Sequence, residues 1–211
     1  MTDSTPAMQP TERFLEAMAL ASQLHANQRR KGSDTPYLAH LLAVTALVLE
    51  HGGTEDEAIA ALLHDAVEDQ GGRPTLEAIR ARFGDHIAAT VSGLTDTDEI
   101  HKPSWRPRKE RYIAHLRTAP YSVRLIAAAD KLHNARSVRN DYRARGESVW
   151  NTFTGGRDGT LWFYPAVLDA LQSAATPHEA RLNALLEELA VVVNDLEIAA
   201  HQHRPTETAG T

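Results

Sequence analysis

Four polar residues follow an apolar run in the segment Ala61-Leu62-Leu63-His64-Asp65-Ala66-Val67-Glu68-Asp69. On a helix over residues 58 to 69, these polar side chains share one arc of roughly 140°, and apolar side chains fill the opposite arc. The preceding turn carries Ala58 and Ala61 on the polar side, where a solvated surface normally shows charged residues. Two interpretations remain open: a metal site beside a water-activating acid, or the solvated side of an amphipathic helix.

The composition indicates one domain with a substantial core, because 42% of the 211 residues are hydrophobic. The sequence contains no cysteine, which excludes disulfide bonds, zinc-thiolate sites and cysteine nucleophiles. A metal ion would therefore be held by His, Asp and Glu. The sequence shows no stretch of about 18 apolar residues and no signal-peptide pattern, so we expect a cytoplasmic protein that does not bind a membrane.

The formal net charge of −6 argues against a general nucleic-acid-binding protein, because such binding needs a basic surface that neutralises many phosphates. A small anionic ligand would need only a local basic cluster. One cluster is the stretch Arg29-Arg30-Lys31, and the other consists of Arg106, Arg108, Lys109 and Arg111. The alternative for both clusters is ordinary surface charge.

Helical patterns recur from end to end and strand patterns do not, which predicts an all-α fold of about eight to ten helices. A capping box at Thr54 and Glu57 marks one helix start, and Thr75 is expected to cap another helix. The expected helices span residues 14–24, 37–50, 54–69, 75–83, 85–94, 106–117, 122–138, 160–173 and 182–196, with a further segment at 142–153. Residues 95–105 and 154–160 are expected to form loops.

Asp130 directly follows the apolar run Leu125-Ile126-Ala127-Ala128-Ala129. A buried carboxylate without a partner is costly, so Asp130 should meet a cation, a metal ion or hydrogen-bond donors. Two kinds of partner fit equally well at this point. One is a basic side chain, with Lys131, Arg124 and Arg136 as candidates, and the other is a metal ion.

His40 lies in an apolar stretch and, taken alone, fits a hydrogen-bonded core histidine. Together with His64, Asp65 and Asp130, it completes a set of two imidazoles and two carboxylates from three helices. Four nitrogen and oxygen ligands leave coordination positions for water and a phosphate oxygen, which suits Mn²⁺ or Fe²⁺.

Glu68 and Asp69 lie one helical turn beyond His64 and Asp65. From there they could accept a proton from an attacking water molecule or orient that water. The alternative is a solvated helix end, although acidic residues near a helix C-terminus are unfavourable to its dipole.

Six motifs follow one another over about residues 12 to 140. They are Gln28-Arg-Arg-Lys31, Thr35-Pro-Tyr-Leu-Ala-His40, Ala61-Leu-Leu-His-Asp-Ala-Val-Glu-Asp69, Phe83-Gly84, Leu94-Thr95-Asp96 and Ala129-Asp-Lys-Leu-His-Asn134. In kind and order they resemble the motifs of the HD-domain (p)ppGpp hydrolases, the hydrolase domain of the RelA/SpoT family. The chain length resembles the small alarmone hydrolases of this family.

The resemblance implies a helical HD fold. We expect one HD phosphohydrolase domain over residues 11–200, between a flexible N-terminus, residues 1–10, and a flexible tail, residues 201–211. It also implies that Glu68 and Asp69 assist the attacking water. The metal ion implied by the resemblance is Mn²⁺, bound by His40, His64, Asp65 and Asp130.

The reaction implied by the resemblance belongs to the stringent response: removal of the 3′-pyrophosphate from ppGpp or pppGpp, giving GDP or GTP and pyrophosphate. Matching of motifs assigns Arg30 and Lys31 to the base or phosphates and Asn134 to the ribose-phosphate region. Lys131, in the same motif as Asn134, is also expected to bind substrate. The guanidinium of Arg29 or Arg30 could stack on a purine. We expect a monomer or homodimer.

Two alternatives to this function remain open. The enzyme could be an HD phosphohydrolase for another nucleotide, such as an adenosine alarmone, a deoxynucleotide or a phosphorylated dinucleotide cofactor. The chain could also be an HD-like module that binds a nucleotide without turnover. Residues 153–164 have no counterpart in the resemblance, and their aromatic residues Trp162, Phe163 and Tyr164 fit either core positions or base stacking.

Overall fold

The computed structural model describes residues 9–97 and 103–202. Within these ranges every regular element is a helix, apart from an isolated bridge between Arg29 and Pro36, so the prediction of an all-α fold is confirmed. The helices are α1 (Glu12–Leu24), α2 (Leu38–Glu50), α3 (Glu55–Leu63), α4 (Ala66–Asp69), α5 (Arg73–Phe83), α6 (Asp85–Leu94), α7 (Trp105–Leu116), α8 (Tyr121–Arg145), the 3₁₀ helix η1 (Gly146–Thr152), α9 (Gly156–Ala174) and α10 (Ala180–Gln202).

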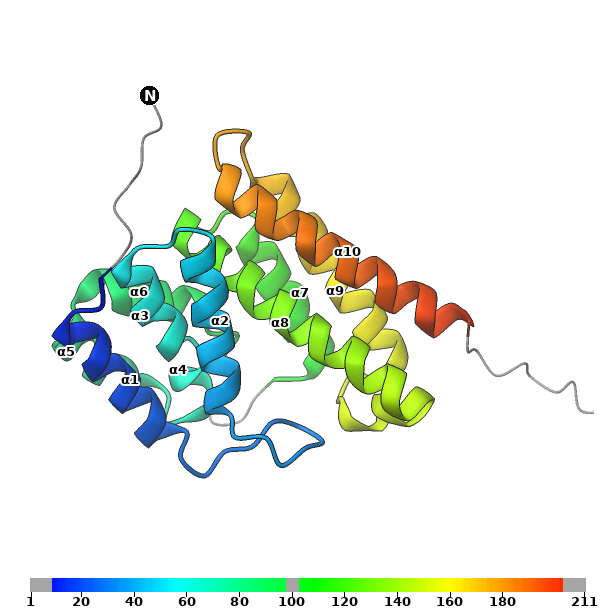
Figure 1. The fold of residues 1–211 in the computed structure, drawn as a ribbon, viewed down its shortest axis with the longest axis horizontal. Coiled ribbons are helices and arrows are strands. Elements are labelled where there is room, and N and C mark those ends of the chain that lie inside the picture. The colour runs from blue at the N-terminus through cyan, green and yellow to red at the C-terminus, as the bar shows by residue number, and fades with distance from the viewer. Residues whose placement is uncertain (1–8, 98–102, 203–211) are drawn as a thin grey trace, which may run out of the picture.

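The long helix α8 joins the two sides of the molecule. It packs against α2, α3 and α6 on one side and against α9 and α10 on the other, as Figure 1 shows. The helix α3 packs among α1, α2, α6 and α8. Among the described residues, no helix is long and apolar enough to cross a membrane. The expected flexible ends lie largely outside the described residues, although His201 and Gln202 belong to the last turn of α10.

The helix α3 begins at the predicted capping box. The backbone N–H of Thr54 donates to Glu57 Oε2 at 2.7 Å, and the backbone N–H of Glu57 donates to Thr54 Oγ1 at 3.3 Å. Ala58 and Ala61 are fully buried and His64 is 3% exposed. The interpretation of this arc as a solvated surface is therefore wrong at these positions.

The prediction of one continuous helix over residues 58–69 is also wrong, because α3 ends at Leu63 and α4 begins at Ala66. The side chain of His64 explains the break. Its Nδ1 donates to the carbonyl oxygen of Ala61 at 2.8 Å, and this is the oxygen that the N–H of Asp65 would use in a continuous helix. The imidazole thus replaces a backbone hydrogen bond, and the chain turns at His64 and Asp65.

The structure corrects two predictions, the cap at Thr75 and the loop at residues 154–160. The helix α5 begins after Gly72, with Pro74 in its first turn, and the hydroxyl of Thr75 donates to the carbonyl oxygen of Gln70 at 2.7 Å instead of capping the helix. Most of the expected loop at 154–160 is the first turn of α9.

Close packing explains two of the three glycines at the start of α9. A Cβ atom on Gly155 or Gly159 would lie 2.7 or 3.0 Å from the ring of Trp105, so these two positions suit glycine because the backbone there lies against an indole. Gly156 has open space around it and a φ of +58°, a backbone conformation that favours glycine. The helix α8 also runs further than predicted, to Arg145, and η1 occupies most of the remaining segment.

Candidate active site

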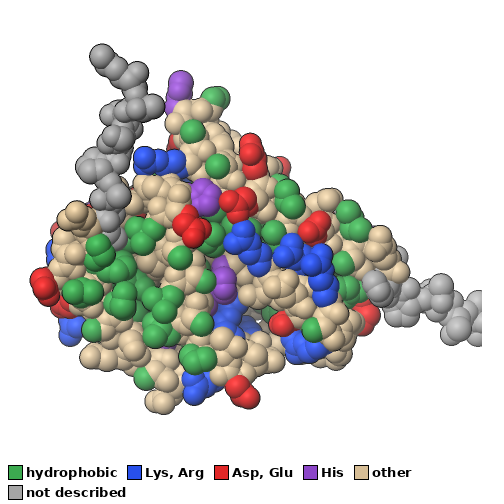
Figure 2. Space-filling view, in the orientation of Figure 1, with side chains coloured by type: hydrophobic (Ala, Val, Ile, Leu, Met, Phe, Trp, Pro, Cys, Tyr) green, Lys and Arg blue, Asp and Glu red, His purple; other side chains and the backbone are tan. Residues whose placement is uncertain are grey.

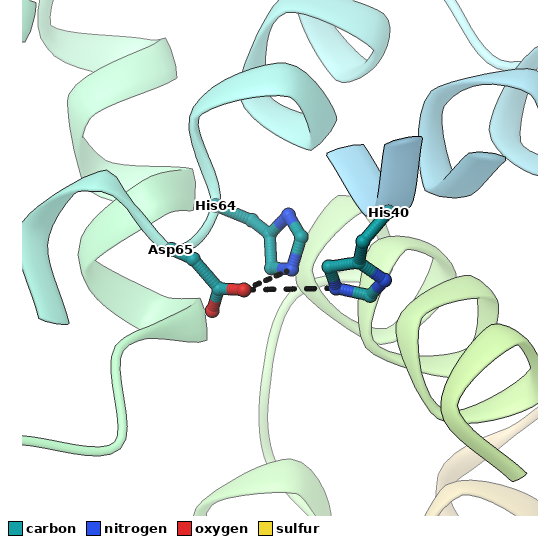
Figure 3. A group of neighbouring side chains, drawn as sticks. All are labelled: His40, His64 and Asp65. Carbon is teal, nitrogen blue, oxygen red and sulfur yellow. Dashed lines mark ion pairs between the residues drawn. The ribbon is translucent and has the colours of Figure 1, made fainter. Parts of the chain in front are cut away.

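Three parts of the fold bring the four predicted metal ligands together. His40 comes from α2, His64 and Asp65 from the turn between α3 and α4, and Asp130 from α8. Figure 3 shows the His40 and His64 rings and the Asp65 carboxylate pointing toward one another. The separations are 3.0 Å for His64 Nε2 to Asp65 Oδ2, 3.2 Å for His40 Nε2 to Asp130 Oδ1, 3.6 Å for His40 Nε2 to Asp65 Oδ2, and 3.7 Å for His64 Nε2 to Asp130 Oδ1.

The two Nε2 atoms of His40 and His64 fit a metal ion. Both are buried and neither has a hydrogen-bond partner, although carboxylate oxygens lie close by. The Nδ1 of His64 must carry a proton because its partner is a carbonyl oxygen, so its Nε2 is the nitrogen available to a cation. Ligand atoms at about 2.1 Å from one ion lie about 3 Å or more from one another, in keeping with the separations seen here.

Outer partners hold both carboxylates. The hydroxyl of Tyr37 donates to Asp65 Oδ2 at 2.5 Å, and the amide of Asn134 donates to Asp130 Oδ1. Lys131 Nζ lies 2.5 Å from Asp130 Oδ2. Asp130 therefore meets a basic neighbour through one oxygen and faces His40 through the other, so both partners considered from the sequence have a place at this residue.

The carboxylates are ionised in this setting. Burial alone would raise the pKa of Asp65 and of Asp130, but His64 beside Asp65 and Lys131 beside Asp130 bring both values well below the usual range. Burial lowers the pKa of His64, and the two carboxylates outweigh that effect and raise it well above its usual value. A metal ion would replace the proton that the carboxylates hold on this ring.

Glu68 and Asp69 lie at the rim of the same pocket, held by residues from other segments. Glu68 Oε1 is 3.6 Å from a guanidinium nitrogen of Arg108, which also donates to Asp96. Asp69 Oδ2 accepts a hydrogen bond from the side-chain amide of Gln28 at 2.8 Å. The structure thus places both acids within one concave surface with Asp65 and Asp130.

The pocket has a volume of about 800 Å³ and a mixed charge. The predicted substrate-binding residues that line it are Arg29, Arg30, Lys31, Lys131 and Asn134, and Arg108 and Lys109 add two further cations. A guanidinium nitrogen of Arg30 donates to Asn134 Oδ1 at 2.7 Å, which links the first and last motifs. On the face seen in Figure 2, Lys and Arg side chains gather near Asp, Glu and His side chains.

Aromatic side chains form another wall of the pocket. Trp105, Phe153, Phe163 and Tyr164 line it, and Phe163 and Tyr164 are each 8% exposed. Trp162 does not line the pocket, and the guanidinium carbon of Arg106 lies 3.4 Å from the centre of its ring. Phe163 and Tyr164 are therefore core residues that also face the pocket, whereas Trp162 packs elsewhere.

Further residues make contacts at the site that the sequence did not predict. No role was assigned from the sequence to Gln28, Tyr37, Asp96 or His133, and Arg108 was named only as part of a basic cluster. His133 Nδ1 lies 2.8 Å from His40 Nδ1, and burial, His40 and Arg30 lower the pKa of His133 to about 4. Four of these residues lie inside the quoted motifs, and His133 follows Asp130 by three positions, so the two share one face of a helix. The spacing was a usable signal for His133, whereas the Arg108 contacts depend on tertiary packing.

Comparison with known proteins gives a consistent family. The HD-domain family model matches residues 17–161. The chain is 37% identical over 129 residues to the guanosine-3′,5′-bis(diphosphate) 3′-pyrophosphohydrolase MESH1 of Xenopus tropicalis, covering 60% of this chain and 69% of that protein. It is 39% identical over 125 residues to a probable GTP pyrophosphokinase of Mycobacterium leprae, covering 58% of this chain but only 15% of that much longer protein.

Two solved structures are similar along most of their length. One is a metazoan orthologue of SpoT described as hydrolysing ppGpp, with a TM-score of 0.67, 27% identity, and coverage of 85% of this chain and 97% of that one. The other, from Listeria monocytogenes, has a TM-score of 0.64, 33% identity, and coverage of 74% and 96%. With its helical fold and clustered His and Asp residues, the chain belongs to the HD-domain family, in the group of small hydrolases that contains the MESH1 proteins.

Proposed function

We propose that this protein is a metal-dependent hydrolase that removes the 3′-pyrophosphate from ppGpp and pppGpp, giving GDP or GTP and pyrophosphate. The names of the MESH1 relatives and of the metazoan structure support this substrate. The observation that carries the proposal is the pair of unpartnered imidazole nitrogens that face two ionised carboxylates in a pocket lined by cations.

The proposed cofactor is Mn²⁺, held by His40, His64, Asp65 and Asp130. Two imidazoles and two carboxylates are a donor set that suits this ion, and no thiolate is available to favour a softer one. A divalent ion bound there would lower the pKa of a coordinated water molecule and offset part of the negative charge of the phosphates.

Glu68 and Asp69 are proposed to handle the proton of the attacking water. In the overall reaction, the water oxygen bonds to the phosphorus on the 3′ oxygen, the bond between that phosphorus and the 3′ oxygen breaks, and the 3′ oxygen gains a proton. Arg108 beside Glu68 and Gln28 beside Asp69 hold the two carboxylates in place. A positioned carboxylate that takes up a proton contributes typically about 10²- to 10⁴-fold to a rate.

The substrate is proposed to lie against the cationic part of the pocket. Arg29, Arg30 and Lys31 would bind the phosphates or stack on the base, and Asn134 would contact the ribose-phosphate region. Lys131 would add positive charge beside Asp130. These side chains concentrate positive charge locally, which a protein with a net charge of −6 needs in order to bind a polyanionic nucleotide.

The test is hydrolysis of ppGpp by the purified protein with Mn²⁺, with products separated by chromatography. We expect GDP and pyrophosphate in equal amounts, and no product after the metal is removed with a chelator. Parallel reactions with an adenosine alarmone, a deoxynucleoside triphosphate and a phosphorylated dinucleotide cofactor cover the alternative substrates. Absence of pyrophosphate from ppGpp with Mn²⁺ present would overturn the proposal. The cytoplasmic location and the monomeric or homodimeric state stay predictions.

A further inference from the structure

The contact between His40 and His133 has a consequence for the metal site. The two Nδ1 atoms are 2.8 Å apart and the ring centres are 4.9 Å apart. His133 lies on α8, one helical turn after Asp130, and His40 on α2 is 1% exposed. One nitrogen of this pair must donate and the other must accept, because a hydrogen bond between them holds a single proton.

In the proposed metal site, the role of Nε2 on the His40 ring decides which nitrogen of the pair donates. Its Nε2 is buried and makes no hydrogen bond, although Asp130 Oδ1 lies 3.2 Å away. A nitrogen that binds a metal ion carries no proton, so a metal ion on Nε2 requires the ring proton of His40 to be on Nδ1. A proton on Nδ1 is satisfied by the Nδ1 lone pair of His133.

We infer that His133 is a positioning residue that keeps the proton of His40 on Nδ1, fixes the ring orientation, and leaves Nε2 free for the metal ion. This inference rests on the metal site of the proposed function. In His64 the proton is also on Nδ1, where it is donated to the backbone carbonyl oxygen of Ala61. The two imidazoles are thus oriented by two different acceptors, of which only the one for His40 is a side chain that mutation can remove.

Two substitutions of His133 distinguish its hydrogen bond to the His40 ring from its contribution to packing. In His133→Asn the amide oxygen can occupy the place of Nδ1, and this oxygen only accepts hydrogen bonds, so it preserves the required donor on His40. In His133→Leu the side chain fills similar space but offers no acceptor. His86→Leu is the matched control, because His86 is exposed on α6 and far from the pocket residues in sequence.

The first measurement is calorimetric titration of Mn²⁺ into the metal-free protein of 211 residues. We expect His133→Leu to bind Mn²⁺ about 10- to 100-fold more weakly than the wild type, and His133→Asn and His86→Leu to stay within about threefold. Circular dichroism and thermal unfolding of each variant establish that the fold is retained. Wild-type affinity in a folded His133→Leu protein would overturn the inference, as would equally weak binding by folded His133→Asn and His133→Leu.

The second measurement reads the tautomer directly in protein loaded with Zn²⁺, a diamagnetic ion suited to nuclear magnetic resonance, and needs no substrate. In Zn²⁺-saturated protein with ¹⁵N-labelled histidine, His40 Nδ1 should carry a proton that exchanges slowly with solvent in the wild type and in His133→Asn, and this proton should exchange faster in His133→Leu. In the metal-loaded wild type, a proton of this contact on His133 Nδ1 instead of His40 Nδ1 would overturn the inference. If the affinity and tautomer results are as expected but ppGpp releases no pyrophosphate, the substrate assignment fails and the role of His133 stands.

Discussion

His64 performs two tasks with one ring. Its Nδ1 donates a hydrogen bond to the carbonyl oxygen of Ala61, and this contact ends α3. Its Nε2 faces Asp65 and Asp130. The chain turn that directs Asp65 toward the two imidazoles is therefore made by one of the proposed ligands. A substitution at this position would change both the local backbone and the donor set.

At the same scale, Asp65 and Glu68 should differ in what they contribute. We expect Asp65→Ala to lose Mn²⁺ binding and turnover together, because it removes a ligand. Glu68→Gln should bind Mn²⁺ as the wild type does but turn over about 10²- to 10⁴-fold more slowly, because the amide cannot accept a proton. Calorimetry and kcat for ppGpp separate the two effects, with Glu16→Gln on the exposed side of α1 as the control. Normal kcat in Glu68→Gln would remove this residue from the mechanism.

At the scale of elements, the pocket is assembled from helix ends and from one tight helix contact. The rings of Trp105 on α7 and Phe163 on α9 lie 6.3 Å apart and both line the pocket. The α9 backbone at Gly155 and Gly159 lies against the Trp105 indole. The aromatic wall thus depends on the absence of side chains at two glycines.

Gly155→Ala tests this contact. The new Cβ would lie 2.7 Å from the Trp105 ring, so we expect a loss of about 1–3 kcal/mol in the free energy of unfolding and a raised KM for ppGpp. In a Trp105→Leu background the same substitution should cost less, because the clashing ring is absent. Denaturant unfolding of the four proteins completes the cycle. Equal costs in both backgrounds would show that the indole is not what excludes a side chain there.

At the scale of the whole molecule, α8 connects the two sides of the fold and contributes several residues to the site. It supplies Asp130, Lys131, His133 and Asn134 within two turns. It also packs against α2, which bears His40, and against α3, which leads into the turn that bears His64 and Asp65. The proposed metal site is therefore built from contacts between core helices, and most of its basic surroundings come from the segments around Arg30 and Arg108.

The sequence predicted most helices and the set of side chains that meet, because helical periodicity and buried polar residues are visible in a single chain. It did not predict the break at His64, since a side chain there replaces a backbone hydrogen bond. It also missed the first turn of α9, where glycines that resemble a loop serve close packing. The contact of Glu68 with Arg108 depends on tertiary geometry that no local pattern contains.

The most direct test of the account is anomalous X-ray scattering from crystals of the protein loaded with Mn²⁺. The account predicts one strong manganese peak within about 2.0–2.3 Å of His40 Nε2, His64 Nε2 and an oxygen of each of Asp65 and Asp130. A manganese-loaded protein with no peak among these four side chains, or with its only ordered peak elsewhere, would contradict it.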